Sequence, residues 1–350
     1  MLANDILSFN FAATGIGSVP FTDVETTCRD IFGILPFVPF WPQFVKRSNL
    51  ENMLLQFTEG LTFLLVDERL GSVTVAEVKD RESHLTPFYE SYLSDDLDAF
   101  AISRNFAPGL YKMIDLAISG QYGNGGFIKG QTVGPFTFAA GVVDRDGRAA
   151  LHNTEIFEAI VSGLCAKALW QTRLLASCGR KPIIFFDEPY LAGFGSAFCT
   201  VQAEQVSDVM SRMIGYLKER SDVLVGVHCC GNTDWAMLLD AGFDIINFDA
   251  FGYLDYFILY HDKILEFLSR GGIIAWGIVP TSEFRGGERP GDLVSRLSAG
   301  LERLCSEGFS ADTLKRQSLL TPACGMGSMD SQKAEEALRL LSDVSLALGR

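Results

Sequence analysis

The second half of the chain alternates short apolar runs with longer amphipathic stretches. The apolar runs have the length of strands, whereas the amphipathic stretches repeat their apolar positions with the period of an α-helix. The expected strands are 130–138, 182–187, 223–229, 245–249, 272–279 and 318–324. The expected helices are 154–177, 203–220, 233–241, 256–269 and 292–307. This alternation is typical of parallel strands joined by crossover helices.

The first third of the chain is less regular. Apolar runs at 11–17 and 33–38 are expected to form two further strands, with a short helix at 23–31 between them. These two strands and the six of the second half make eight, which is the number that closes a TIM barrel.

The last amphipathic stretch, 328–348, is expected to be the final outer helix, capped by Asp330 or Ser331. The sequence therefore predicts an α/β fold, a (β/α)8 TIM barrel that takes residues 1–350 as one domain. Residues 41–129 are too many for one crossover connection, so we expect them to form an inserted subdomain or lid between early strands.

Composition and charge narrow the function classes. The 350 residues are 48% hydrophobic and 21% charged, which is enough apolar material for a large core. The 29 basic and 43 acidic side chains give a net charge of −14, so we expect neither a nucleic-acid partner nor a membrane surface. No export signal or membrane span is expected, and the eight cysteines favour a reducing, cytoplasmic location.

Candidate metal ligands lie at the ends of predicted strands, where barrel enzymes place their sites. Because side chains alternate along a strand, His228 and Cys230 share one face and Cys229 points away. Cys324 ends the last strand, and Asp249 ends the strand that neighbours His228. A histidine, two thiolates and a carboxylate suit tetrahedral zinc. The alternative is that these cysteines pack as small apolar residues, which is common for free cysteine.

Two other strand ends carry candidate site residues. Asp187 and Glu188 are adjacent carboxylates that could bind an ammonium group or act as catalytic acid and base. The alternative is that Asp187 caps the next segment and Glu188 is solvated. Ser18 ends the segment 14–18, which contains Gly15 and Gly17. The backbone amides of these glycines could approach a ligand carboxylate, although a simple tight turn explains the same residues.

Taken together, these motifs resemble a known family. The chain is similar to the catalytic C-terminal half of cobalamin-independent methionine synthase, within the barrel superfamily that also contains uroporphyrinogen decarboxylase. The shared elements, in family order, are Ile16-Gly17-Ser18, Gly134-Pro135-Phe136-Thr137, Asp187-Glu188-Pro189, His228-x-Cys230 and Pro322-Ala323-Cys324-Gly325.

The resemblance implies a zinc-dependent methyl transfer to a small thiol, with homocysteine as acceptor and methionine as product. It maps the metal ligands onto His228, Cys230 and Cys324, with the carboxylate position near Asp249, where the family usually has Glu. It also implies that Ser18 contacts the substrate carboxylate and that Asp187 contacts the substrate ammonium group. The family's second acidic contact for that ammonium has no match in this sequence.

The resemblance also bears on the methyl donor. Full-size family members carry an additional N-terminal barrel that helps to bind a polyglutamylated folate. A chain restricted to the catalytic half resembles the short form, for which methylcobalamin or a corrinoid protein is the expected donor, with folate as the remaining possibility.

Two other functions are compatible with this superfamily. The first is a metal-free decarboxylase like uroporphyrinogen decarboxylase, which binds a polyanion and needs several basic residues at its cleft. Here Arg285 and Arg289 fall in loops or helices, and the net charge is unfavourable for such a substrate. The second is a non-catalytic barrel that binds a corrinoid, which the fold alone does not distinguish from an enzyme.

Overall fold

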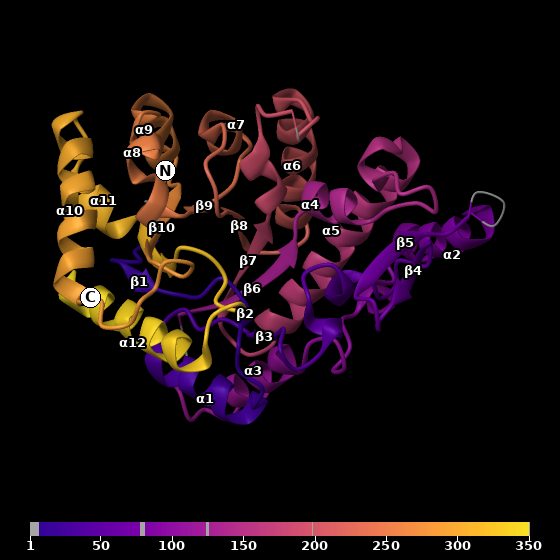
Figure 1. The fold of residues 1–350 in the computed structure, drawn as a ribbon, viewed down its shortest axis with the longest axis horizontal. Coiled ribbons are helices and arrows are strands. Elements are labelled where there is room, and N and C mark those ends of the chain that lie inside the picture. Colours follow the sequence, from indigo (N-terminus) through magenta and orange to yellow (C-terminus); the bar gives the residue numbers. More distant parts are fainter. Residues whose placement is uncertain (1–6, 78–80, 124–125, 198, 350) are drawn as a thin grey trace.

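A curled sheet of parallel strands forms the centre of the fold (Figure 1). The computed structural model describes residues 7–77, 81–123, 126–197 and 199–349. Within these ranges the sheet has seven strands in the order β1-β11-β10-β9-β8-β7-β6, consistent with a TIM-barrel-like fold. Its strands are β1 (Ala12–Ala13), β6 (Phe127–Val133), β7 (Lys181–Asp187), β8 (Leu224–Cys229), β9 (Ile245–Phe248), β10 (Ile273–Val279) and β11 (Ser318–Pro322).

Helices follow the strands as the amphipathic pattern predicts. Asn153 caps the longest helix through the amide of Ile156, and Asp330 caps the last one through the amides of Gln332 and Lys333. The helices of this part are α4 (Pro135–Gly141), α5 (Thr154–Ala176), α6 (Ala203–Lys218), α7 (Trp235–Asp240), α8 (Ala250–Ile258), α9 (His261–Ser269), α10 (Pro290–Ser306), α11 (Ala311–Arg316) and α12 (Ser331–Ala347).

Two expected element boundaries are wrong. The strand expected at 130–138 ends at Val133, because Pro135 occupies the first turn of α4. The helix expected at 256–269 is two helices, because Asp249 caps α8 and the chain turns at Tyr260 before α9 begins. In both cases a cap or a proline starts a helix inside an apolar run, which periodicity alone does not resolve.

The strand expected at 33–38 is also wrong. Helix α1 (Val24–Ile34) continues into this range, and residues 37–41 run beside β6 without forming a regular strand. Three backbone hydrogen bonds join the two segments: the amides of Phe127 and Lys129 donate to the carbonyls of Phe37 and Pro39, and the Trp41 amide donates to the Lys129 carbonyl. Pro36, Pro39 and Pro42 have no N–H, so a full ladder is impossible here.

Hydrogen bonds of buried side chains also connect residues 37–41 to β6. Trp41 Nε1 donates to Gln171 Oε1 at 2.8 Å, and Gln171 Nε2 donates to the Gln131 carbonyl at 3.0 Å. Gln131 Nε2 in turn donates to the Trp41 carbonyl at 3.2 Å. All three side chains are fully buried, so these bonds satisfy polar groups that water does not reach.

Replacing Gln171 by Leu is therefore expected to lower the free energy of unfolding by about 2–4 kcal/mol. The change leaves the indole N–H of Trp41 and the backbone carbonyl of Gln131 without these partners. Each buried unsatisfied group costs roughly 1–3 kcal/mol. Urea unfolding followed by circular dichroism measures the difference. The exposed Gln205→Leu on α6 is the matched control and should change stability by less than about 0.5 kcal/mol.

The described residues between α1 and β6 form a hairpin, two helices and several single turns. In Figure 1, α2 and the hairpin lie at the end of the molecule opposite α10. The elements are β3 (Gln43–Phe44), which pairs with β2 (Ser18–Val19), the hairpin strands β4 (Leu64–Asp67) and β5 (Ser72–Val75), α2 (Arg81–Leu93) and α3 (Pro108–Ile118). The 3₁₀ turns are Asn49–Glu51, Leu55–Phe57 and Leu97–Phe100, with two more at Ala150–His152 and Pro189–Gly193.

The sheet separates two apolar clusters. Residues such as Ile183, Phe185 and Ile245 face the barrel interior, whereas their neighbours Ile184 and Phe186 pack against the outer helices. Nearer the carboxyl ends of the strands, the inward-facing positions become polar and are Gln131, Asp187, His228, Asn247 and Thr321. These five polar side chains form a layer inside the barrel at the carboxyl end of the sheet, where TIM-barrel enzymes have their active sites.

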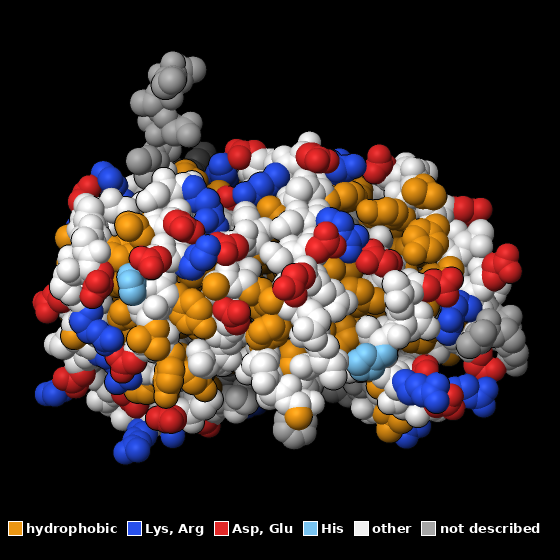
Figure 2. Space-filling model, turned by 90° about the horizontal axis from the view of Figure 1, so that it is seen from above, with side chains coloured by type: hydrophobic (Ala, Val, Ile, Leu, Met, Phe, Trp, Pro, Cys, Tyr) orange, Lys and Arg blue, Asp and Glu red, His pale blue; other side chains and the backbone are white. Residues whose placement is uncertain are grey.

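The surface carries both signs of charge. Figure 2 shows acidic and basic side chains interspersed on the face seen from above. None of the helices in the described ranges has the length and apolar character that a membrane span requires.

Candidate metal centre

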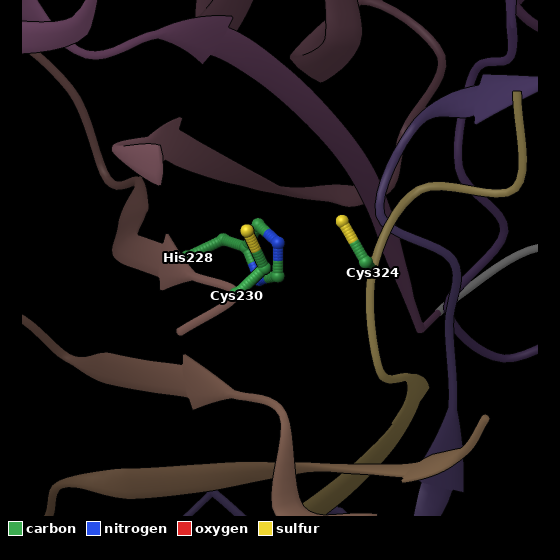
Figure 3. Close-up of side chains that lie close together, drawn as sticks. All are labelled: His228, Cys230 and Cys324. Carbon is green, nitrogen blue, oxygen red and sulfur yellow. The ribbon is translucent and has the colours of Figure 1, made fainter. Parts of the chain in front are cut away.

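Three side chains from two distant parts of the sequence meet at the carboxyl end of the sheet. His228 lies near the end of β8, Cys230 follows that strand, and Cys324 follows β11. One ligand atom from each residue lies within 4.8 Å of the other two. Figure 3 shows His228 and Cys230 reaching this space from one side and Cys324 from the other. Cys229 faces outward into the helix layer, as the strand alternation predicts.

His228 is fixed from below by the adjacent strand. Its Nδ1 lies 2.5 Å from Asn247 Oδ1, and the side chain is only 3% exposed. Its Nε2 is buried and has no hydrogen-bond partner among the described residues. A buried ring nitrogen without a partner normally needs an explanation, and a metal ion is one that suits imidazole.

The two cysteines share their protons unequally. Contact with Cys324 and with His228 lowers the pKa of the Cys230 thiol well below its ordinary value, although partial burial acts in the opposite direction. The same contact raises the pKa of Cys324. Burial disfavours a charged His228, but the neighbouring Cys230 and Asp187 outweigh it and raise the pKa of the imidazole. The contacts within this cluster thus favour loss of the proton from Cys230 over loss of the proton from Cys324.

The donor set fits zinc. Tetrahedral zinc has bonds of about 2.0–2.3 Å to nitrogen and sulfur, which places its ligands roughly 3.3–3.8 Å apart. The three donor atoms lie within 4.8 Å of one another, so small side-chain rotations would bring them to that spacing. Two thiolates and one imidazole leave a fourth position for a further ligand or a substrate.

Asp249 lies beside this cluster but has another partner. Its Oδ1 accepts a hydrogen bond of 2.7 Å from the Gly252 amide and caps α8. It is absent from the described group of side chains whose ligand atoms lie within 4.8 Å of one another. With Cys230 and Cys324 it lines a second pocket, of about 440 Å³, so its role as a fourth ligand stays a proposal.

A pocket of about 280 Å³ opens directly onto the three candidate ligands. Ser18 and Asp187 line it, as do the apolar residues Ile16 and Val45. Among the described residues, no Arg or Lys lines it. Its lining also includes Gln43, Asn52, Met53, Pro189, Gly325, Gly327 and Ser328.

Close backbone approach holds Ser18 in this pocket. The amide of Gly327 donates to Ser18 Oγ at 3.3 Å, and the amide of Met326 donates to the Ser18 carbonyl at 2.9 Å. A Cβ at Gly325 would lie 2.2 Å from Ser18 Oγ, so this position has no space for a side chain. The loop after β11 therefore positions both Cys324 and Ser18.

Asp187 is a buried carboxylate with spare hydrogen-bonding capacity. Its Oδ1 has no partner among the described residues, and the side chain is 4% exposed. Burial raises its pKa to about 6, although His228 and the fully buried Lys129 act to lower it. Lys129 itself is held by the Ile16 carbonyl at 2.5 Å and by Gln131 Oε1 at 3.2 Å. Asp187 thus offers an acceptor to a ligand that carries a donor or a positive charge.

Glu188 has a structural partner instead. Its carboxylate accepts the amides of Phe136 and Thr137, both at 2.9 Å, and the Thr137 hydroxyl at 2.6 Å. These donors lie in the first turn of α4, so Glu188 anchors that helix to β7. It does not line the pocket beside the cluster. Its catalytic role stays a prediction.

Sequence patterns did not identify some residues of the site. Gln43, Val45, Asn52 and Met53 come from the irregular stretch after α1, where no periodicity marks the positions that face the pocket. Asn247 does carry a signal in the sequence, because it lies two positions before Asp249 and side-chain alternation places it on the same face of the strand.

Comparisons with known proteins place the fold. No protein-family model matches the chain, and no curated protein sequence matches it. Among solved structures, a B12-independent methionine synthase from Shewanella sp. W3-18-1, in complex with selenomethionine, is similar with a TM-score of 0.59 and 15% identity. The match covers 96% of this chain and 97% of that chain. At this identity the similarity shows a shared TIM-barrel-like fold.

Proposed function

We propose that this chain is a zinc-dependent methyltransferase that acts on a small thiol, with homocysteine as the acceptor and methionine as the product. The observation that carries the proposal is the convergence of His228, Cys230 and Cys324 on one space beside a pocket. The fold shared with a methionine synthase supports it. Methylcobalamin, a corrinoid protein and a folate are the candidate methyl donors.

In this proposal His228, Cys230 and Cys324 hold the zinc, with Asp249 as the candidate fourth ligand. Zinc, when bound, would lower the pKa of the acceptor thiol and keep its sulfur nucleophilic at neutral pH. Ser18 would bind the substrate carboxylate and Asp187 its ammonium group. The acceptor thiol would lose its proton to solvent. Its sulfur would then form a bond to the methyl carbon while the bond from that carbon to the donor breaks, and the electron pair of the broken bond would leave with the donor.

The residues around the acceptor suit this chemistry. Ile16 and Val45 give the pocket apolar walls, which exclude water from the sulfur and strengthen the charge contact with Asp187. A polyanionic substrate, as a decarboxylase of this superfamily would bind, would find no Arg or Lys among the described residues that line the pocket.

Metal analysis and a transfer assay test the proposal together. Protein purified without added metal is expected to contain about one zinc per chain. With homocysteine it should then form methionine from methylcobalamin, from a methylated corrinoid protein or from methyltetrahydrofolate. Folded protein without zinc would contradict the proposal. A zinc-containing protein that binds cobalamin but transfers no methyl group from any of the three donors would favour the non-catalytic barrel.

A further inference from the structure

We propose that Asn247 is a positioning residue that keeps a proton on Nδ1 of His228 and thereby presents Nε2 to the metal. This inference rests on the proposed zinc centre and assigns a role to a residue outside the ligand set. The register of the sheet places the two residues side by side, because His228 of β8 pairs directly with Asn247 of β9. Both side chains point into the barrel and are buried, Asn247 completely.

The orientation of the Asn247 amide follows from its other contacts. Its Nδ2 donates to the Ala275 carbonyl and to Thr321 Oγ1, both at 2.8 Å. A hydroxyl can accept or donate, but a backbone carbonyl only accepts. A flipped amide would bring Oδ1 against the Ala275 carbonyl, with two acceptors facing each other. The Ala275 contact therefore fixes Oδ1 toward His228.

The protonation of the ring follows in turn. Asn247 Oδ1 is an acceptor 2.5 Å from His228 Nδ1, so Nδ1 must carry a proton to make this bond. In the neutral imidazole the lone pair then lies on Nε2, the atom without a partner among the described residues. Without Asn247, the ring could carry its proton on either nitrogen or rotate about χ2.

The structure thus contains a chain of two contacts that ends at the candidate metal site. The Ala275 carbonyl of β10 orients Asn247 of β9, and Asn247 orients His228 of β8. Each contact joins neighbouring strands of the sheet, so the barrel itself sets the direction of the nitrogen lone pair. Partners of this kind typically change metal affinity by about 10- to 100-fold when they are removed.

The first test uses the wild-type protein loaded with zinc. Nitrogen-15 NMR of histidine distinguishes a ligated nitrogen from a protonated one, and the chain has only four histidines to assign. A His228→Gln variant identifies the signal of interest. We expect Nε2 to be ligated and Nδ1 to carry a proton, and ligation through Nδ1 would overturn the inference.

The second test compares three variants in a competition assay with a chromophoric zinc chelator at one pH. Asn247→Leu removes the acceptor and is expected to weaken zinc binding by about 10- to 100-fold. Asn247→Asp keeps an acceptor toward Nδ1 and should retain affinity even if the fold is less stable. The matched control is Asn105→Leu, which makes the same chemical change at an exposed residue outside the site and should leave zinc affinity unchanged.

The outcomes separate the two proposals. Wild-type protein that binds no zinc contradicts the proposed function and the role of Asn247 together. Equal zinc affinity in the wild type and in Asn247→Leu contradicts the role of Asn247 alone. Circular dichroism and thermal unfolding of each variant show whether a lost affinity reflects a lost fold, and the NMR test on the wild type needs no variant of Asn247.

Discussion

Replacing Cys324 by Ser is expected to remove zinc and to reduce methyl transfer by at least about 1,000-fold. Cys324 is the one candidate thiolate that reaches the cluster from β11, and a hydroxyl is a far weaker zinc ligand than a thiolate. A bound metal contributes several kcal/mol to charge stabilisation in a reaction of this type, and each 1.36 kcal/mol corresponds to a tenfold change in rate. Metal analysis after dialysis and the transfer assay measure the two effects.

Cys305→Ser is the matched control for this substitution. Cys305 is a partly exposed cysteine on α10 and lies outside the cluster, so the variant makes the same chemical change elsewhere. It should keep one zinc per chain and the wild-type rate. A Cys324→Ser protein that retains both zinc and turnover would rule out the proposed ligand set, provided that its circular dichroism spectrum matches the wild type.

Replacing Asp187 by Asn is expected to raise KM for homocysteine by about 10- to 100-fold while the zinc content stays unchanged. Asp187 has a buried oxygen without a partner among the described residues and lines the pocket beside the candidate ligands. A hydrogen bond to a charged group contributes roughly 1.5–3 kcal/mol, which corresponds to this range of affinity. The asparagine removes the negative charge with little change in side-chain volume.

A second acceptor makes this prediction sharper. A thiol of similar size without the amine, such as 3-mercaptopropionate, has no ammonium group for Asp187 to bind. We expect the wild type to use it poorly and the Asp187→Asn variant to lose little further efficiency with it. If the substitution weakens both acceptors equally, Asp187 does not bind the ammonium group, and its effect on the site is general.

The regular half of the fold was predictable because its signals are local. Strands such as β7 and β8 are apolar runs between a helix end and a polar strand tip, and their observed bounds lie within a few residues of the expected ones. The same alternation predicts His228 on the inner face and Cys229 on the outer face, and the structure has Cys229 in the outer apolar cluster. Local patterns are sufficient where each strand is followed directly by its helix.

The irregular first third was not predictable in the same way. The second strand position is taken by residues 37–41, which join β6 through a few backbone bonds and through Gln171, located 130 residues beyond Trp41 in the sequence. No local pattern indicates that a distant glutamine replaces a strand ladder. The pocket residues Asn52 and Met53 come from the same irregular stretch, so neither they nor their neighbours could be assigned from periodicity.

The candidate site falls between these two cases. His228 and Cys230 are a sequence motif at the end of β8, whereas Cys324 follows β11, three strands away in the sheet, and meets them because the sheet is curled. The role of Asp249 cannot be predicted from its position at the end of a strand alone, because the carboxylate that was predicted to bind metal also caps α8. A short polar residue at the end of a strand can serve either purpose.

The layered interior of the barrel has an evolutionary consequence. The apolar residues that fill its lower part, among them Ile183, Phe185 and Ile245, are separate from the polar tips that would perform the chemistry. Exchange of His228 or Cys324 for another polar residue would remove a candidate metal ligand without removing those apolar contacts. Descendants of such a barrel can therefore change their reaction through a few substitutions at strand tips, and folding places little constraint on that change.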